Sequence, residues 1–335
     1  MDKQIRPKSS VETVKKRYLF FGEKEVRGRC PIYEKLALQI AADLDLISLI
    51  ATFPKNKRQP NLLLASLRKF FNRVPSFQEA RALMLDNPEP LTDIIFSHST
   101  QTNEPGRCAT LLPLLCQLPQ PLALLEIGTS AGLCLIPDLY NYRYGAELLT
   151  GAPAHPEFEL ACAAGAGVSI PKKLPEVVWR AGLDTNPLNI HDAEQRSWLE
   201  MLVWPSQKAR LQRLQASITL AAKEDLHLET GDLHTLDLEE MISKAPQDAT
   251  LVVFHSAVLS YTLETKQRDA FAERIRTLTD YWVSNELPLL FSSFGCDLIN
   301  ERTGSDFLLA LNGKPFAWTD PHGASIIAVE HSTDV

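Results

Sequence analysis

The chain has 335 residues, 45% of them hydrophobic, and a formal net charge of −7 at pH 7. That length is enough for one large domain and a smaller one. The acidic balance argues against a partner with a phosphate backbone, so no nucleic acid is expected. No uninterrupted apolar run approaches the roughly 20 residues of a membrane span, so no membrane is expected either.

The cysteines and histidines favour a cytoplasmic protein without a bound metal. The six cysteines are scattered and include no C-x-x-C pair, which is typical of reduced, buried thiols. The N-terminal stretch has charges but no apolar segment behind them, unlike a secretory signal. The eight histidines include no H-E-x-x-H motif, so no metal site is predicted.

Residues 1–115 predict an N-terminal domain made of helices only. One helix begins at Pro31 and carries an apolar stripe of Ile32, Leu36, Ile40 and Leu44. Another begins at Pro60, and Ser76 with Glu79 forms a capping-box signature before a third.

A dense polar run, STQTNEPGR over residues 99–107, directly precedes an apolar helix predicted over 109–118. A capped helix start explains part of this run. The full set of polar side chains also fits a lid over a ligand crevice. That interpretation predicts substrate-side contacts from Gln101, Asn103, Glu104 and Arg107.

The stretch from Pro121 to Tyr142 organises the second domain, residues 116–335. Residues 122–127 predict a buried strand, residues 128–132 a turn of small residues, and residues 133–140 a helix. Such a unit presents free N–H groups and the positive end of a helix dipole to an anionic ligand. Glu126 lies inside the apolar run, either as an internal hydrogen-bond partner or facing the crevice.

The turn GTSAG fits three chemistries unequally. A dinucleotide fingerprint needs three glycines, and only Gly128 and Gly132 are present. The pattern of S-adenosylmethionine methyltransferases, an acidic residue and then a glycine-rich turn, is met by Glu126 and these two glycines. Ser130 replaces its middle glycine. The same five residues also spell the nucleophile elbow of serine hydrolases, with Ser130 as nucleophile.

Two further strands carry acidic candidates. Residues 145–176 are rich in Gly, Ala and Pro and predict an irregular insertion. The strand after it ends in Asp184, where this fold places the acid that binds ribose hydroxyls. The strand over 226–230 leads to Asp232, the candidate residue near adenine.

The next strand, 249–254, ends in His255 and Ser256 at the expected crevice edge. His255 is the candidate base because its ordinary pKa is about 6.5. The other interpretation is that its ring packs over the sheet and hydrogen-bonds a backbone carbonyl. A helix over 266–282, a fifth strand over 287–294 and closing strands at 307–311 and 325–329 complete a seven-stranded sheet.

Six runs, occurring in order, carry a resemblance to a known family: QTNEPGR, LLEIGTSAGLCL, GLDTNPLNI, LVWPSQKARLQRL, VVFHSAVLSY and WVSNE. They resemble a bacterial family known as domain of unknown function 2332, over nearly the whole chain. This resemblance implies an α/β fold of the class I methyltransferase (Rossmann-like) type, and no established reaction or substrate.

The sequence therefore predicts an S-adenosylmethionine-dependent methyltransferase with a small-molecule or protein acceptor that it does not specify. The methionine carboxylate is expected near residues 128–132, ribose on Asp184 and adenine near Asp232. One alternative is a ligand-binding protein without catalysis on the same scaffold. A lesser alternative is a serine hydrolase that uses Ser130 with Asp297 and His322. The sequence does not indicate an oligomeric state.

Overall fold

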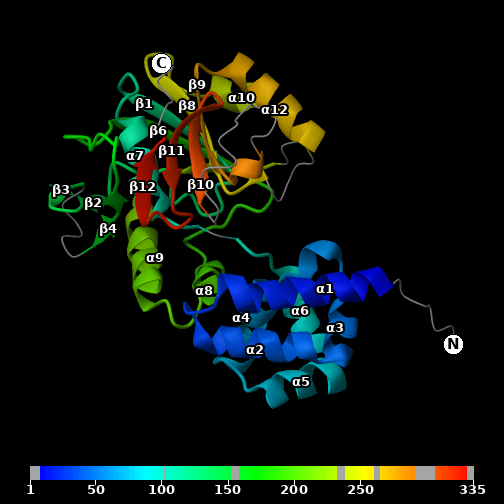
Figure 1. Cartoon of the computed structure of the whole chain (residues 1–335). Helices are drawn as coiled ribbons and strands as arrows, with labels where there is room; N and C mark the ends of the chain where they lie inside the picture. The colour runs from blue at the N-terminus through cyan, green and yellow to red at the C-terminus, as the bar shows by residue number, and fades with distance from the viewer. Residues whose placement is uncertain are drawn as a thin grey trace, which may run out of the picture. The chain divides into compact units, whose positions relative to one another are not determined.

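The computed structural model describes residues 8–101, 103–151, 158–231, 238–259, 265–290 and 306–329. The chain forms two compact units (Figure 1), Met1–Thr102 with Asp192–Gln212 and Asn103–His191 with Arg213–Val335. We call them the helical unit and the sheet unit. Residues 103–115 thus belong to the sheet unit and residues 192–212 to the helical unit, whereas the sequence predicts a single boundary at 115.

The helical unit packs its helices around one apolar core, which includes Trp198 and Leu202. The capping box of Ser76 and Glu79 is confirmed at the start of α5. The helices are α1 (Lys8–Phe20), α2 (Pro31–Ala42), α3 (Leu44–Ile50), α4 (Pro60–Phe71), α5 (Phe77–Asp86), α6 (Glu89–Ser97) and α8 (Ala193–Leu202), with a π-helical turn at Phe21–Glu25 and a 3₁₀ turn at Lys55–Lys57.

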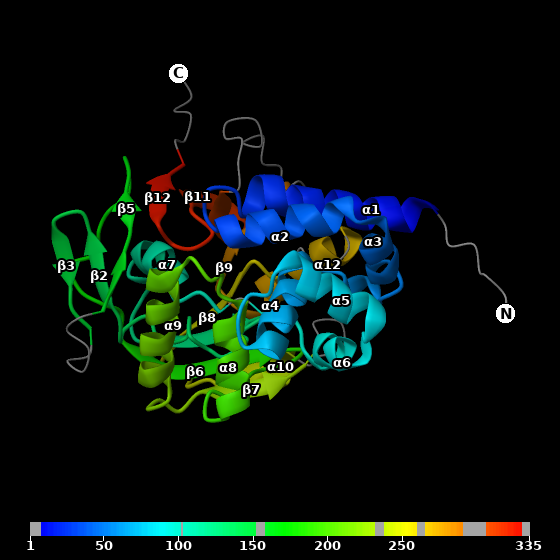
Figure 2. The same cartoon turned by 90° about the horizontal axis from the view of Figure 1, so that it is seen from below.

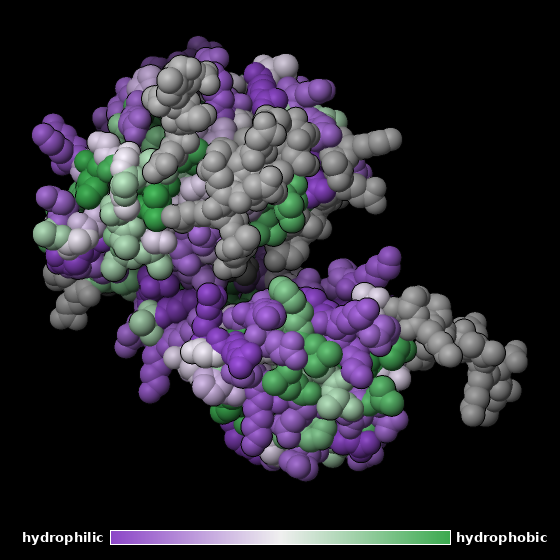
Figure 3. Space-filling view, viewed as in Figure 1, coloured by the Kyte–Doolittle hydropathy of each residue, from purple (hydrophilic) through white to green (hydrophobic). Residues whose placement is uncertain are grey.

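The apolar stripe predicted along α2 is only half right. Leu36 and Ile40 are buried, whereas Ile32 is 49% and Leu44 62% exposed. The reason at Leu44 is Asp43, whose side chain accepts hydrogen bonds from two amides and caps α3, so that Leu44 begins a new helix. Apolar residues accordingly lie among hydrophilic ones on the surface of this unit (Figure 3).

The sheet unit is built on a nine-stranded mixed sheet in the order β5-β12-β11-β10-β9-β8-β1-β6-β7. From β7 to β9 neighbouring strands are parallel, and β10, β11 and β12 continue antiparallel. The seven strands that the sequence predicts are therefore too few. The strands are β1 (Leu122–Ile127), β5 (Ala163–Ala164), β6 (Val177–Asp184), β7 (His227–Thr230), β8 (Thr250–Ser256), β9 (Tyr281–Glu286), β10 (Phe307–Leu311), β11 (Lys314–Thr319) and β12 (Ser325–Ala328).

The fifth parallel strand lies earlier than predicted. β9 covers Tyr281–Glu286, and α12 (Thr265–Leu278) ends before it. Of the predicted strand over 287–294, residues 288–290 form a 3₁₀ turn and residues 291–294 lie outside the described residues. The carboxyl-terminal half of β9 is Ser-Asn-Glu, which is fully buried despite its polarity, so hydropathy does not indicate a strand there.

The helix predicted over residues 133–140 is wrong. These residues form turns and lead into β2 (Asn141–Tyr144). Pro137 is one reason, because a proline inside a helix removes a hydrogen bond and clashes with the preceding turn. β2 joins β3 (Glu147–Leu149) and β4 (Glu159–Ala161) in a small sheet, and β5 then pairs with β12 at the edge of the large sheet (Figure 2).

The remaining helices of the sheet unit are α7 (Arg107–Leu115), α10 (Leu238–Ser243) and α12, while α9 (Lys208–Ala221) spans the division between the units. Apolar residues of α10 and α12 form one core with β1, β6, β8 and β9. Every residue of α7 is buried. No helix in the described part of the chain is long and apolar enough to cross a membrane.

Candidate functional site

The candidate site is the edge of the large sheet where β1, β6, β8 and β9 end. In a sheet of this order the strand sequence reverses between β1 and β8, which is where open α/β sheets bind ligands. Ile127 lies in register with Leu183 of β6 and His255 of β8, so these carboxyl ends meet. We call this region the carboxyl edge, comprising residues 126–132, Asp184, 255–259 and 285–286.

The turn after β1 uses its amides inside the protein. The N–H groups of Gly128 and Thr129 both donate to the carbonyl of Leu183, at 2.7 and 3.2 Å. The amide of Ser130 donates to Asp184 Oδ2 at 2.8 Å, and that of Leu133 to Asn103 Oδ1 at 3.1 Å. Since no helix follows either, the predicted anion site of free amides and a helix dipole is wrong for this turn.

Backbone strain gathers at the carboxyl edge. Ser130 has φ of 51° and Ala257 has φ of 58°, a left-handed conformation that is costly for residues with a Cβ. The other described non-glycine residues with positive φ are Asn72 and Asn312, and asparagine tolerates this conformation. Ser130 follows β1 and Ala257 follows β8, the two strands at the point of reversal. Strain placed there indicates a functional site.

The two turns contact each other through Gly128 and Val258. A Cβ atom on Gly128 would overlap the side chain of Val258, and Gly128 has φ of 74°. Both facts favour glycine at this position. Because Val258 fills this space, the face of Gly128 is not an approach surface for a ligand.

Glu126 is an internal hydrogen-bond partner. It is buried, and its Oε2 accepts a hydrogen bond from the Thr129 hydroxyl at 2.9 Å. Burial raises the pKa of Glu126 well above its ordinary value, and nearby Cys134 adds to this rise. Of the two interpretations left open by the sequence, the geometry favours the internal partner.

Asp184 lies beside this turn at the end of β6. Its Oδ2 accepts from the amide of Ser130, and its Oδ1 accepts from the amide of Asn186 at 2.9 Å. The residue is only partly buried. Since each oxygen accepts one of these amide bonds and has two lone-pair directions, a ligand hydroxyl still fits here. Asp232 lies outside the described residues.

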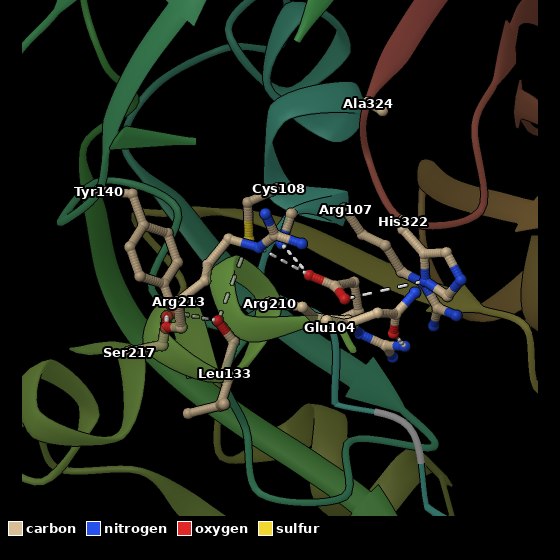
Figure 4. A network of polar contacts seen from close by, with 12 residues as sticks. Glu104, Arg107, Cys108, Leu133, Tyr140, Arg210, Arg213, Ser217, His322 and Ala324 are labelled. Atoms are coloured by element: carbon tan, nitrogen blue, oxygen red, sulfur yellow. Dashed lines mark hydrogen bonds and ion pairs between the residues drawn. The ribbon is translucent and has the colours of Figure 1, made fainter. Parts of the chain in front are cut away.

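The polar segment before α7 ties the sheet unit together. Asn103 donates to the carbonyl of Thr129 at 2.7 Å and accepts from Leu133, so it clamps the turn after β1. Glu104 is 1% exposed, and its Oε1 accepts from Arg213 Nε at 3.1 Å and from the Gly106 amide (Figure 4). His322 Nδ1 lies 3.7 Å from its other oxygen.

Arg107 completes this clamp. Its Nη1 donates to the carbonyl of Ser256 at 3.0 Å and its Nε to that of Pro321 at 2.9 Å. The Ser256 hydroxyl accepts a bond from Asn285 at 3.2 Å. Gln101 belongs to the helical unit. The predicted lid residues 103–107 therefore serve the packing of the sheet unit, and this geometry offers no support for a movable lid.

His255 is the centre of a buried chain of hydrogen bonds. It is 0% exposed, and Trp282 Nε1 donates to its Nε2 at 3.0 Å. An indole N–H only donates, so Nε2 carries no proton and the imidazole is neutral. Its Nδ1–H then donates to Glu286 Oε1 at 2.8 Å. With both ring nitrogens engaged, His255 has none left to act as a base on a substrate.

Glu286, at the end of β9, is the residue that the sequence interpretation missed. Its Oε1 also accepts from the amides of Val258 and Leu259, at 2.8 and 3.1 Å. Its Oε2 is buried and has no hydrogen-bond partner among the described residues. The available signal was the motif WVSNE, in which an aromatic and a β-branched residue precede three polar residues. The run VVFHS of β8 likewise begins with β-branched and aromatic residues and ends in polar ones.

No group of three His, Cys, Asp or Glu side chains in the described ranges could hold a metal ion. A family model described as "Uncharacterized protein conserved in bacteria (DUF2332)" matches residues 15–326. The chain therefore belongs to this family. No curated protein matches it.

The first prediction tests the structural role of His255. His255→Ala removes the buried hydrogen bonds that this ring makes with Trp282 Nε1 and with Glu286 Oε1, so the free energy of unfolding should fall by about 1–3 kcal/mol. Urea unfolding measures this. His227→Ala is the control, because that side chain is 51% exposed and its loss should change stability by less than about 0.5 kcal/mol. A variant as stable as the wild type would contradict the assignment.

The second prediction concerns the pH dependence of stability. The pKa of Glu126 is raised on folding, so its stabilising contribution is full below its ordinary pKa of 4.5 and is lost as pH rises through the folded value. The amide side chain of the variant Glu126→Gln does not titrate. The stability of this variant relative to the wild type should therefore rise between pH 5 and 8, by at most about 1.4 kcal/mol per pH unit.

Urea unfolding at pH 5, 6.5 and 8 would show this trend. Glu240→Gln is the matched control, since that glutamate is exposed and should show little change. If the stabilities of Glu126→Gln and the wild type ran parallel across this range, Glu126 would not be the titrating group.

Proposed function

We propose that this member of the DUF2332 family is an S-adenosylmethionine-dependent methyltransferase, with the cofactor at the carboxyl ends of β1 and β6. The observation that carries the proposal is the parallel order β7-β6-β1-β8-β9 with Asp184 bonded to the turn after β1. This order is that of the first five strands of doubly wound nucleotide-binding sheets, which bind ligands at the reversal point.

The residues at this edge fit an adenosyl group in part. Asp184 can accept from ribose hydroxyls, and the buried Ser130 hydroxyl has no partner among the described residues. Because Val258 covers Gly128, the nucleoside part of the ligand belongs on the Asp184 side of the turn. S-adenosylmethionine would supply an electrophilic methyl group there. The protein's part is to bind and orient the reactants, since the transfer is a direct displacement.

The third prediction tests cofactor binding. S-adenosylhomocysteine should bind the wild type, and Asp184→Asn should weaken this binding roughly 10- to 100-fold, because hydrogen bonds to a charged acceptor are worth about 1.5–3 kcal/mol. Isothermal titration calorimetry measures both affinities. Asp225→Asn, whose side chain is 90% exposed, is the matched control and should bind like the wild type.

Absence of heat and of any thermal shift with wild-type protein at millimolar S-adenosylhomocysteine or S-adenosylmethionine would overturn the proposal. If Asp184→Asn bound S-adenosylhomocysteine as tightly as the wild type, the cofactor site would not include the end of β6.

A binding protein without catalysis on the same scaffold is the second candidate. It is favoured by the internal use of His255, Asn103 and Arg107, which leaves none of these three as an evident catalytic group. Transfer of a labelled methyl group from S-adenosylmethionine to any component of a bacterial extract would exclude it.

The strained Ser130 favours a serine hydrolase to a lesser degree. A positive φ and an unpaired hydroxyl are features of a nucleophile elbow. However, no described histidine hydrogen-bonds Ser130, and Asp297 lies outside the described residues. The fourth prediction is that a fluorophosphonate leaves Ser130 unlabelled, because the hydroxyl has no base to activate it. Mass spectrometry of treated wild type and Ser130→Ala decides this, and stoichiometric labelling of Ser130 would establish the hydrolase.

A further inference from the structure

Three glutamates are buried in the described part of the chain, and they differ in the groups around them. Glu104 pairs with Arg213. Burial raises the pKa of Glu126 well above its usual range, which favours its protonated form, and its Oε2 accepts from the Thr129 hydroxyl. Glu286 is 1% exposed, and within the described ranges its sole ion-pair neighbour is His255.

His255 cannot balance the charge of Glu286. Its Nε2 accepts the indole N–H of Trp282, so the ring is neutral and donates one hydrogen bond. Two backbone amides add hydrogen bonds to the same oxygen, Oε1, but no charge. An uncompensated buried carboxylate costs several kcal/mol, so a protein that keeps one gains something from it elsewhere.

The free oxygen is held in a fixed place. Three donors orient Oε1, and the chain from Trp282 through His255 prevents the carboxylate from turning. Val258, whose amide is one of these donors, also contacts Gly128. Glu286 therefore lies at the carboxyl edge, at the end of β9, and is bonded to the loop that touches the candidate cofactor turn.

From these observations we propose that Glu286 Oε2 binds the α-ammonium group of the adenosyl amino acid, with His255 and Trp282 as positioning residues. This inference rests on the proposed function, and it names the part of the cofactor that the chain recognises by charge. A primary ammonium supplies what Oε2 lacks, namely an N–H donor and a positive charge.

The fifth prediction compares a ligand that has the amino-acid part, with its ammonium and carboxylate, and one that lacks it. S-adenosylhomocysteine has the ammonium, whereas 5′-methylthioadenosine has the same nucleoside thioether without the amino acid. Glu286→Gln should weaken the binding of S-adenosylhomocysteine roughly 30-fold or more, the loss typical of removing one partner of a buried charge pair. The affinity for 5′-methylthioadenosine should stay unchanged. Calorimetry measures the four affinities. Glu240→Gln is the control on an exposed glutamate.

A test on the wild type covers the case in which Glu286→Gln does not fold. N-acetylation removes the positive charge of the α-ammonium and leaves the carboxylate, so the acetylated ligand should bind roughly 30-fold or more weakly than S-adenosylhomocysteine. Equal affinities for charged and acetylated ligand, or equal losses for both ligands in Glu286→Gln, would overturn the inference and leave the proposed function standing. If the wild type bound neither S-adenosylhomocysteine nor 5′-methylthioadenosine, both this inference and the proposed function would be overturned.

Discussion

The turn after β1 has no helix behind it, and the arrangement of the carboxyl edge depends on this. In a strand–turn–helix unit the helix orders the turn, and the free amides at its start face a ligand. Pro137 and the turns around it remove that helix here. The amides of the turn are satisfied instead by Asp184 and Asn103, which come from other parts of the chain. A turn of small residues that resembles those of nucleotide-binding sheets is thus held by side chains, and residues 103–107 become part of the scaffold.

The loop after β8 is held in a similar way. Glu286 accepts the amides of Val258 and Leu259, just after the strained Ala257. Val258 then packs on Gly128 and links this loop to the turn after β1. Because the contact is side chain against glycine, one turn cannot move toward the other without displacing Val258. The positions of the two turns are therefore linked through this contact.

Much of the sheet was predictable from the sequence, and its carboxyl edge was not. Apolar runs locate β1 and β8, and the acid after a strand locates Asp184, because burial leaves a direct hydropathy signal. β9 was misplaced because its last three residues are polar and buried, a state that depends on partners distant in sequence. For the same reason the sequence left His255 open between a base and a packed ring, because no local pattern shows that Trp282 and Glu286 engage both of its ring nitrogens.

The three buried glutamates show how one fold treats the same group differently. Glu104 forms an ion pair with Arg213, and burial raises the pKa of Glu126, which favours its protonated form. Both arrangements reduce the electrostatic cost of burying a carboxyl group without any ligand. Glu286 has a neutral imidazole and two amides on one oxygen and no described partner on the other. Of the three, only Glu286 has a buried oxygen that lacks a hydrogen-bond partner in the described ranges. The proposed ammonium contact is therefore assigned to Glu286 rather than to Glu104 or Glu126.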